Sequence, residues 1–312
     1  MKSFSGTGNS NQKWLRWVGT LLSVGVLIYL LASQGWREIG QALAKLSLWR
    51  VVLALLLMFG SRLAVTLRWH VLLRSAGVCI PFSHSLRLTF SGLFASNVLP
   101  TTIGGDVFRL AGAVQTKLDA ATITASLIAD RLIGMAGMAM ALPFGVPAWL
   151  ELRQEWFSWQ RLTFAGFALG VTSPFNRIFE RMVCFLRETL QTLGIWRKRR
   201  RALVISLGWT WIHMLCLFGS LALLFEGLGE PLALWKIGGL WSLVYFVTLI
   251  PISINGYGLQ EISLTVIFST AGGISQAAGL TVALLIRVLT MLASLPGAFF
   301  VPSILSGEET VG

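Results

Sequence analysis

The chain has 312 residues, of which 55% are hydrophobic and 12% are charged, and its mean hydropathy is +0.73. Soluble domains carry about 25% charged residues, so this composition argues against a soluble fold and for one polytopic membrane domain. The net charge of +12 does not require a nucleic-acid partner, because basic loops beside an anionic membrane surface account for it.

The predicted elements begin with a disordered cytoplasmic tail at residues 1–16, followed by a single transmembrane domain at 17–312. The long apolar runs approach the ~20 residues that a bilayer requires. Helices are expected at 17–32, 48–67, 120–150, 157–171 and 202–225, and a last long apolar stretch at 274–304. Segment 174–196 has apolar residues at helical spacing and arginines elsewhere on the wheel, which is typical of an interfacial helix.

Two hydrophobic segments, Ser83–Ala113 and Leu234–Ser269, do not fit simple spans, because each breaks at a proline followed by a glycine-containing turn. An offset of 151 residues places Pro100 over Pro251 and also aligns the turns. With an odd number of crossings between them, regions 48–150 and 202–305 are predicted to form an inverted repeat with two re-entrant helical hairpins. The alternative is a pair of kinked helices whose glycines serve packing alone.

Charged residues at membrane depth are costly, so they indicate pairing or function. Asp106 precedes Arg131 by 25 positions, and Glu261 precedes Arg287 by 26, which predicts one acid–arginine pair in each half. Asp130 lies beside Arg131 and is interpreted as a second buried partner of that arginine. Two roles stay open for the pairs: they fix each hairpin to the next helix, or their arginines also face a lipid phosphate.

Each hairpin is expected to restart a helix inside the membrane, near Asp106 and near Gly258. A helix N-terminus offers unpaired N–H groups and a partial positive charge, which suit an anion such as phosphate.

Four stretches, "RLAVTLRWHVLLRSAG", "NVLPTTIGGDVFRL", "ADRLIG" and "PISINGYGLQE", resemble the membrane region of lysylphosphatidylglycerol synthases, which also occurs alone as flippase-like membrane proteins. The resemblance covers roughly residues 48–305. It implies that the protein handles a phospholipid or polyprenyl-type lipid and moves its head group between leaflets. The second hairpin departs from the family pattern, since Asn255 and Tyr257 flank glycines and Gln260 stands where arginine is common.

The family motifs map onto Arg68–Trp69, Gly104–Gly105–Asp106, Asp130–Arg131 and Glu261. Together with the residues singled out above, they define a candidate head-group site. The site consists of Arg62, Arg68, Asn97, Gly104, Gly105, Asp106, Arg109, Asp130, Arg131, Asn255, Gly256, Gly258, Glu261 and Arg287.

The expected function is therefore lipid transport, in which an anionic head group is bound at the membrane midplane and moved between leaflets. A lipid-binding scaffold for a membrane enzyme is the alternative, and an intramembrane aspartyl protease using Asp106 and Asp130 is a weaker one. No enzymatic activity, metal or cofactor is expected. The expected partners are an anionic lipid, a lipid-modifying enzyme and a second copy of the chain, without nucleic acid.

The positive charges predict the orientation. The proposed inner segments hold 16 Lys and Arg residues, whereas the outer segments hold five. This bias predicts a multi-pass protein of the cell membrane with both termini in the cytoplasm.

Overall fold

The computed structural model describes residues 46–98, 104–116, 118–145, 147, 199–249 and 257–306, and throughout these ranges the regular structure is helical. Several predictions fall outside them: the tail 1–16, the helices 17–32 and 157–171, and the interfacial segment 174–196. Of the hairpin turns, Pro100, Asn255 and Gly256 also lie outside the described residues.

Four of the described helical segments are long and apolar enough to cross a membrane. They are α3 (Leu48–Ser75), α6 (Ala120–Ala141) with the short 3₁₀ helix η1 (Leu142–Gly145), α10 (Arg200–Gly227) and α13 (Gln276–Ser294). Large apolar side chains such as Leu56, Val204 and Leu215 are exposed on them. An apolar exposed surface on long helices is what lipid contact requires, so the chain is an integral, multi-pass membrane protein.

Three predicted boundaries are corrected by the structure. Helix α3 continues to Ser75, eight residues past the predicted end, because its last turns are buried against the protein instead of lying in a loop. Helix α6 ends at Ala141, since Pro143 lies in the 3₁₀ turn that follows. The last apolar stretch is two helices, α13 and α14 (Pro296–Ser306), because a proline lacks the N–H that a continuous helix needs.

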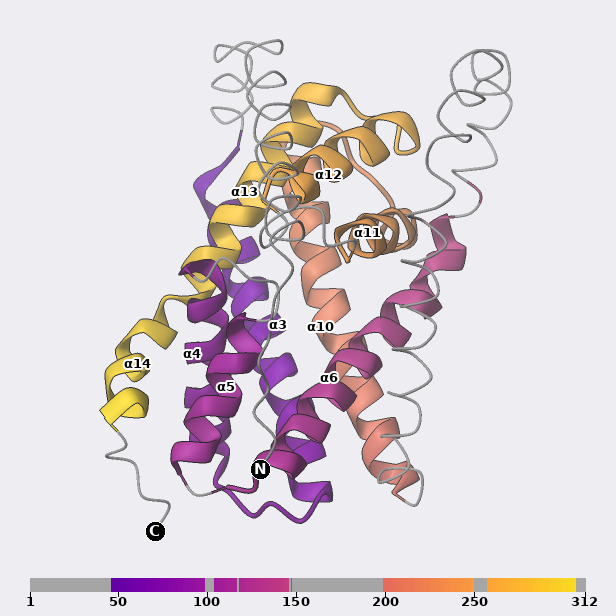
Figure 1. Ribbon diagram of the computed structural model, residues 1–312. Helices are drawn as coiled ribbons and strands as arrows, with labels where there is room; N and C mark the ends of the chain where they lie inside the picture. Colours follow the sequence, from indigo (N-terminus) through magenta and orange to yellow (C-terminus); the bar gives the residue numbers. More distant parts are fainter. Residues whose placement is uncertain are drawn as a thin grey trace, which may run out of the picture.

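Helices α3 and α10 pack side by side in opposite directions (Figure 1). Three of the hydrogen bonds between the two helices show this direction, because as the residue lies later in α3 its partner lies earlier in α10. The pairs are Arg50 with Glu226, Ser61 with His213, and Arg68 with Ser206. The two long antiparallel helices therefore form the frame on which the shorter helices pack.

The first of the two broken segments forms α4 (Phe82–Val98) and α5 (Gly104–Gln115), which pack antiparallel. Gly92 of α4 faces Gly105 of α5 so closely that a Cβ on Gly105 would lie 2.5 Å from the carbonyl oxygen of Gly92. Only glycines permit this approach, which holds the start of α5 against α4.

The second broken segment forms α11 (Leu234–Thr248) and α12 (Leu259–Thr270), which lie at the other end of the molecule in Figure 1. Gly258 precedes α12 with φ +77°, a left-handed conformation that favours glycine. Both α5 and α12 have 12 residues, or about 18 Å at 1.5 Å per residue. That length is too short for a bilayer core of ~30 Å. The re-entrant path and the inversion of the repeat stay predictions.

Candidate functional site

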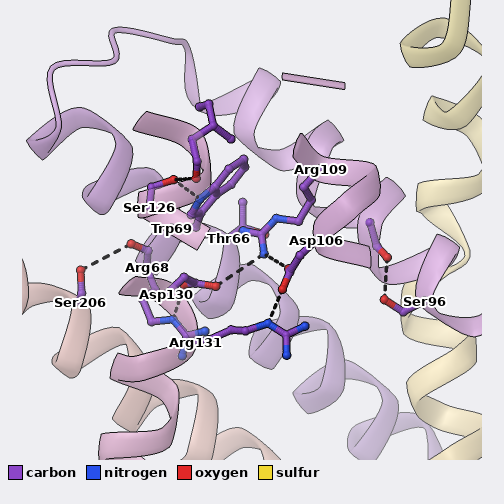
Figure 2. A network of polar contacts seen from close by, with 12 residues as sticks. Thr66, Arg68, Trp69, Ser96, Asp106, Arg109, Ser126, Asp130, Arg131 and Ser206 are labelled. Atoms are coloured by element: carbon purple, nitrogen blue, oxygen red, sulfur yellow. Dashed lines mark hydrogen bonds and ion pairs between the residues drawn. The ribbon is translucent and has the colours of Figure 1, made fainter. Parts of the chain in front are cut away.

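A cluster of five charged side chains lies where α3, α5 and α6 meet (Figure 2). We call it the first-half cluster, and its members are Arg68, Asp106, Arg109, Asp130 and Arg131. The cluster contains three arginines and two aspartates, so its formal net charge is +1. Arg68, Arg109 and Asp130 are buried, whereas 45% of the Arg131 side chain is exposed.

Asp130 pairs with Arg68 and not with its neighbour Arg131. Its Oδ1 accepts a hydrogen bond from Nε of Arg68 at 2.6 Å, and Nη1 of the same arginine donates to Thr210 at 3.3 Å. The predicted pairing of the adjacent residues Asp130 and Arg131 is wrong, because consecutive side chains on a helix point about 100° apart.

Arg131 instead donates from Nε to Oδ2 of Asp106. This is the pair that the spacing predicts, and it joins α6 to the first turn of α5. Asp106 also lies near the N-terminus of α5, where the helix dipole favours a negative charge.

Arg109 is the most confined of the three arginines. Its Nη1 lies 3.3 Å from Oδ1 of Asp106 and 3.5 Å from Oδ2 of Asp130, and its guanidinium carbon lies 4.0 Å from the centre of the Trp69 ring. Trp69 is held in place because its Nε1 donates to Ser126. Two further nitrogens of Arg109, Nε and Nη2, are buried without a hydrogen-bond partner.

The second half has a simpler arrangement, which we call the second-half pair. Nε of Arg287 on α13 donates to Oε1 of Glu261 on α12 at 2.5 Å. The guanidinium of Arg287 also lies 4.9 Å from the ring centre of Tyr257. The prediction of this pair is confirmed. The other carboxylate oxygen, Oε2 of Glu261, is buried without a partner.

Asn97 connects the two halves near the end of α4. Its backbone carbonyl accepts a hydrogen bond from the Tyr257 hydroxyl at 3.0 Å, and its side-chain amide donates to Ser294 of α13 at 2.6 Å. The chain just before the first turn is thereby bonded to the chain just after the second.

The remaining predicted site residues are distributed as follows. Gly104 and Gly105 are buried at the start of α5, and Gly258 precedes α12. Arg62 lies on α3 six residues before Arg68 and is not a member of the first-half cluster. Its Nε is buried without a hydrogen-bond partner. Asn255 and Gly256 are outside the described residues.

Several contributors could not be predicted from the sequence. Thr210, Ser126 and Ser294 are ordinary polar residues within apolar helices, and their roles come from contacts with residues distant in the chain. No sequence signal marks them. Among the described residues there is no group of three or more His, Cys, Asp or Glu side chains that could hold a metal ion.

Comparison with known proteins identifies the family of this chain. Residues 16–297 match the family described as "Lysylphosphatidylglycerol synthase TM region". A relative from Methanothermobacter thermautotrophicus, described as a UPF0104 membrane protein, is 23% identical over 291 residues, with 81% of this chain and 85% of the relative covered. Since the family match spans most of the chain, including all four long apolar helical segments, this protein belongs to the lysylphosphatidylglycerol synthase transmembrane-region family.

Proposed function

We propose that the protein binds the phosphate-bearing head group of a phospholipid or polyprenyl-type lipid at the first-half cluster and moves it between the leaflets. Arg109 carries this proposal. Asp130 already has Arg68 as its closest partner, and Asp106 already has Arg131. The charge of Arg109 is therefore surplus, and its buried Nε and Nη2 lack acceptors.

A phosphate would supply what Arg109 lacks. Buried polar groups without partners are costly and rare, and a guanidinium binds phosphate through two parallel hydrogen bonds. The Trp69 ring supports the guanidinium from one side, and the partly exposed Arg131 provides a second cation at the outer edge of the cluster.

The arrangement of the two halves supports transport beyond binding. Asp106 is the third residue of α5 and Glu261 the third of α12, while Arg131 and Arg287 are each the twelfth residue of the next long helix. The corresponding helices α3 and α10 both have 28 residues and run antiparallel. The predicted inversion of the repeat would allow the two halves to exchange their accessible sides.

An aspartyl protease receives less support from this geometry. Such an enzyme needs two carboxyl groups that share a proton. Here Asp106 lies between Arg109 and Arg131, and Asp130 lies between Arg68 and Arg109, so each carboxyl group is paired with arginines. We therefore propose that the protein is not an enzyme. From the distribution of Lys and Arg, we further propose that it lies in the cell membrane with both termini in the cytoplasm.

A leaflet-exchange assay on the purified protein in liposomes tests the proposal. We expect movement of labelled phosphatidylglycerol or of a labelled polyprenyl phosphate, and little movement of a labelled neutral glycolipid without phosphate. Arg109→Gln should fold, because each aspartate keeps another arginine. The variant loses charge-assisted hydrogen bonds of about 1.5–3 kcal/mol each, so lipid affinity should fall at least about tenfold.

Arg50→Gln is the matched control, because Arg50 pairs with the exposed Glu226 outside the cluster. It should transport like the unmodified protein. Saturable lipid binding without movement between leaflets would favour the alternative function, a lipid-binding scaffold for a membrane enzyme. Equal movement of the neutral glycolipid would show that phosphate recognition is not the basis of activity.

A further inference from the structure

The two acid–arginine pairs differ in one respect. Both acids occupy the third position of a 12-residue helix, and both accept from Nε of an arginine on the next long helix. Both oxygens of Asp106 are engaged, Oδ2 by Arg131 and Oδ1 by Arg109. Within the described ranges, Glu261 pairs with Arg287 alone, through Oε1, and its Oε2 is buried without a partner.

Among the residues that the structure describes, Arg287 is the one cation paired with Glu261. Only 4% of its side chain is exposed. On the helices packed against α12, the charged or titratable side chains are Arg287 of α13 and Lys236 and Tyr245 of α11. Lys236 donates to the carbonyl of Gly272, beyond the far end of α12. Tyr257, just before α12, donates its hydroxyl to Asn97. Within the described chain, the charge of Glu261 therefore depends on Arg287 alone.

A lipid phosphate that reached the second half would compete with Glu261 for Arg287. If Arg287 turned toward the phosphate, Glu261 would be left as a buried carboxylate without a cation. A carboxylate in that position takes up a proton, because ionisation without a partner in apolar surroundings is strongly unfavourable. Asp106 would behave differently, since it keeps Arg109 when Arg131 turns away.

We propose that Glu261 is a proton-binding site that couples lipid movement to protons: Arg287 is exchanged from Glu261 to the lipid phosphate, and Oε2 of Glu261 takes up one proton from the aqueous side that is open. When the phosphate leaves, Arg287 returns and the proton is released. The proposal rests on the proposed function. It also explains why the pair is useful, because an anionic head group that moves with one proton crosses the bilayer core without net charge, and net charge there is costly.

Proton uptake on lipid binding is the direct test. The purified protein is mixed at weak buffering with dihexanoyl phosphatidylglycerol, a short-chain anionic lipid, and a pH indicator records proton uptake while intrinsic tryptophan fluorescence records binding. We expect uptake that saturates with binding and does not exceed one proton per bound lipid, because only a lipid that reaches Arg287 releases Glu261. Glu261→Gln should bind lipid without this uptake, because the amide has no proton to gain.

Transport supplies the second readout. In liposomes, the rate should fall as pH rises, approaching about tenfold per pH unit at the alkaline end, the limit for one required proton. A proton gradient should bias the labelled lipid toward the less acidic side. Glu261→Gln should transport independently of pH and of the gradient. Glu226→Gln, the same change at an exposed acid, should keep both responses.

The outcomes separate the two proposals. If the unmodified protein shows no saturable binding of the lipid, the proposed function is wrong and the proton site falls with it. If lipid binds without proton uptake, the proton site alone is refuted, and this measurement does not depend on whether Glu261→Gln folds. Persistence of the full pH dependence in a folded Glu261→Gln variant would also refute it.

Discussion

The buried pair of Arg68 and Asp130 should dominate the stability of the first-half cluster. Breaking a buried ion pair typically costs about 3–5 kcal/mol, whereas replacing both members can be nearly neutral. Asp130→Leu leaves Arg68 and Arg109 without their shared acid, so we expect a loss near the upper end, about 5 kcal/mol. Arg68→Met leaves Asp130 with Arg109 at 3.5 Å, so about 3 kcal/mol is expected.

The double variant should cost clearly less than the sum of the two single losses, because it removes both charges of the pair together. If the two side chains are partners, the combined cost should fall short of the sum of the single costs by about 3 kcal/mol, the upper range for directly coupled residues. The assay is the free energy of unfolding of the purified protein, titrated with SDS in mixed micelles. Arg50→Gln, at an exposed pair, should cost about 0–1 kcal/mol.

Strict additivity of the two losses, to within about 0.5 kcal/mol, would refute the pairing. A larger loss for Arg68→Met than for Asp130→Leu would contradict the role assigned to Arg109, because that arginine would then give Asp130 no support.

Three further predictions concern the helices around the site. Gly105→Ala should destabilise the protein by about 1–3 kcal/mol in the same SDS titration, since the new Cβ would lie 2.5 Å from the Gly92 carbonyl oxygen. Gly208→Ala is the control and should not destabilise it, because a Cβ there meets nothing within 4 Å. Equal effects of the two substitutions would contradict the close packing of α4 and α5. Asp119 caps α6, and hydrogen bonds from Thr122 lower the pKa of its carboxyl group. Its stabilising contribution should therefore be present at neutral pH and disappear as pH falls through the lowered pKa, and Asp119→Ala should remove this acid-side dependence from the thermal unfolding midpoint. Cys79 is exposed in the segment between α3 and α4, which is predicted to face the cytoplasm, so a membrane-impermeant thiol reagent should not label it in intact cells. Gly229→Cys, in a chain without its native cysteines, should be labelled, because that position is predicted to face outward. Labelling of Cys79 would overturn the predicted orientation.

Local patterns in the sequence predict a large part of this structure. The long apolar runs predict α3, α6, α10 and α13, because membrane spans need continuous apolar helices. The pairs Asp106–Arg131 and Glu261–Arg287 follow from spacing, because each joins the start of a short helix to the middle of the next one.

The partner of Asp130 could not be predicted in the same way. Arg68 lies 62 residues earlier in the chain, and only the packing of α3 against α6 brings the two together. The same is true of Arg109 against Trp69 and of Tyr257 against Asn97. Sequence spacing detects contacts between consecutive elements, whereas contacts across the bundle depend on how all the helices pack.

The claim that Arg109 is the head-group anchor is tested most directly by a structure of the protein in nanodiscs that contain phosphatidylglycerol. We predict a phosphate whose oxygens lie about 2.7–2.9 Å from Nε and Nη2 of Arg109, with Arg68 still bonded to Asp130. Ordered lipid phosphates found only away from the first-half cluster, with Nε and Nη2 of Arg109 bonded to protein groups, would contradict the account.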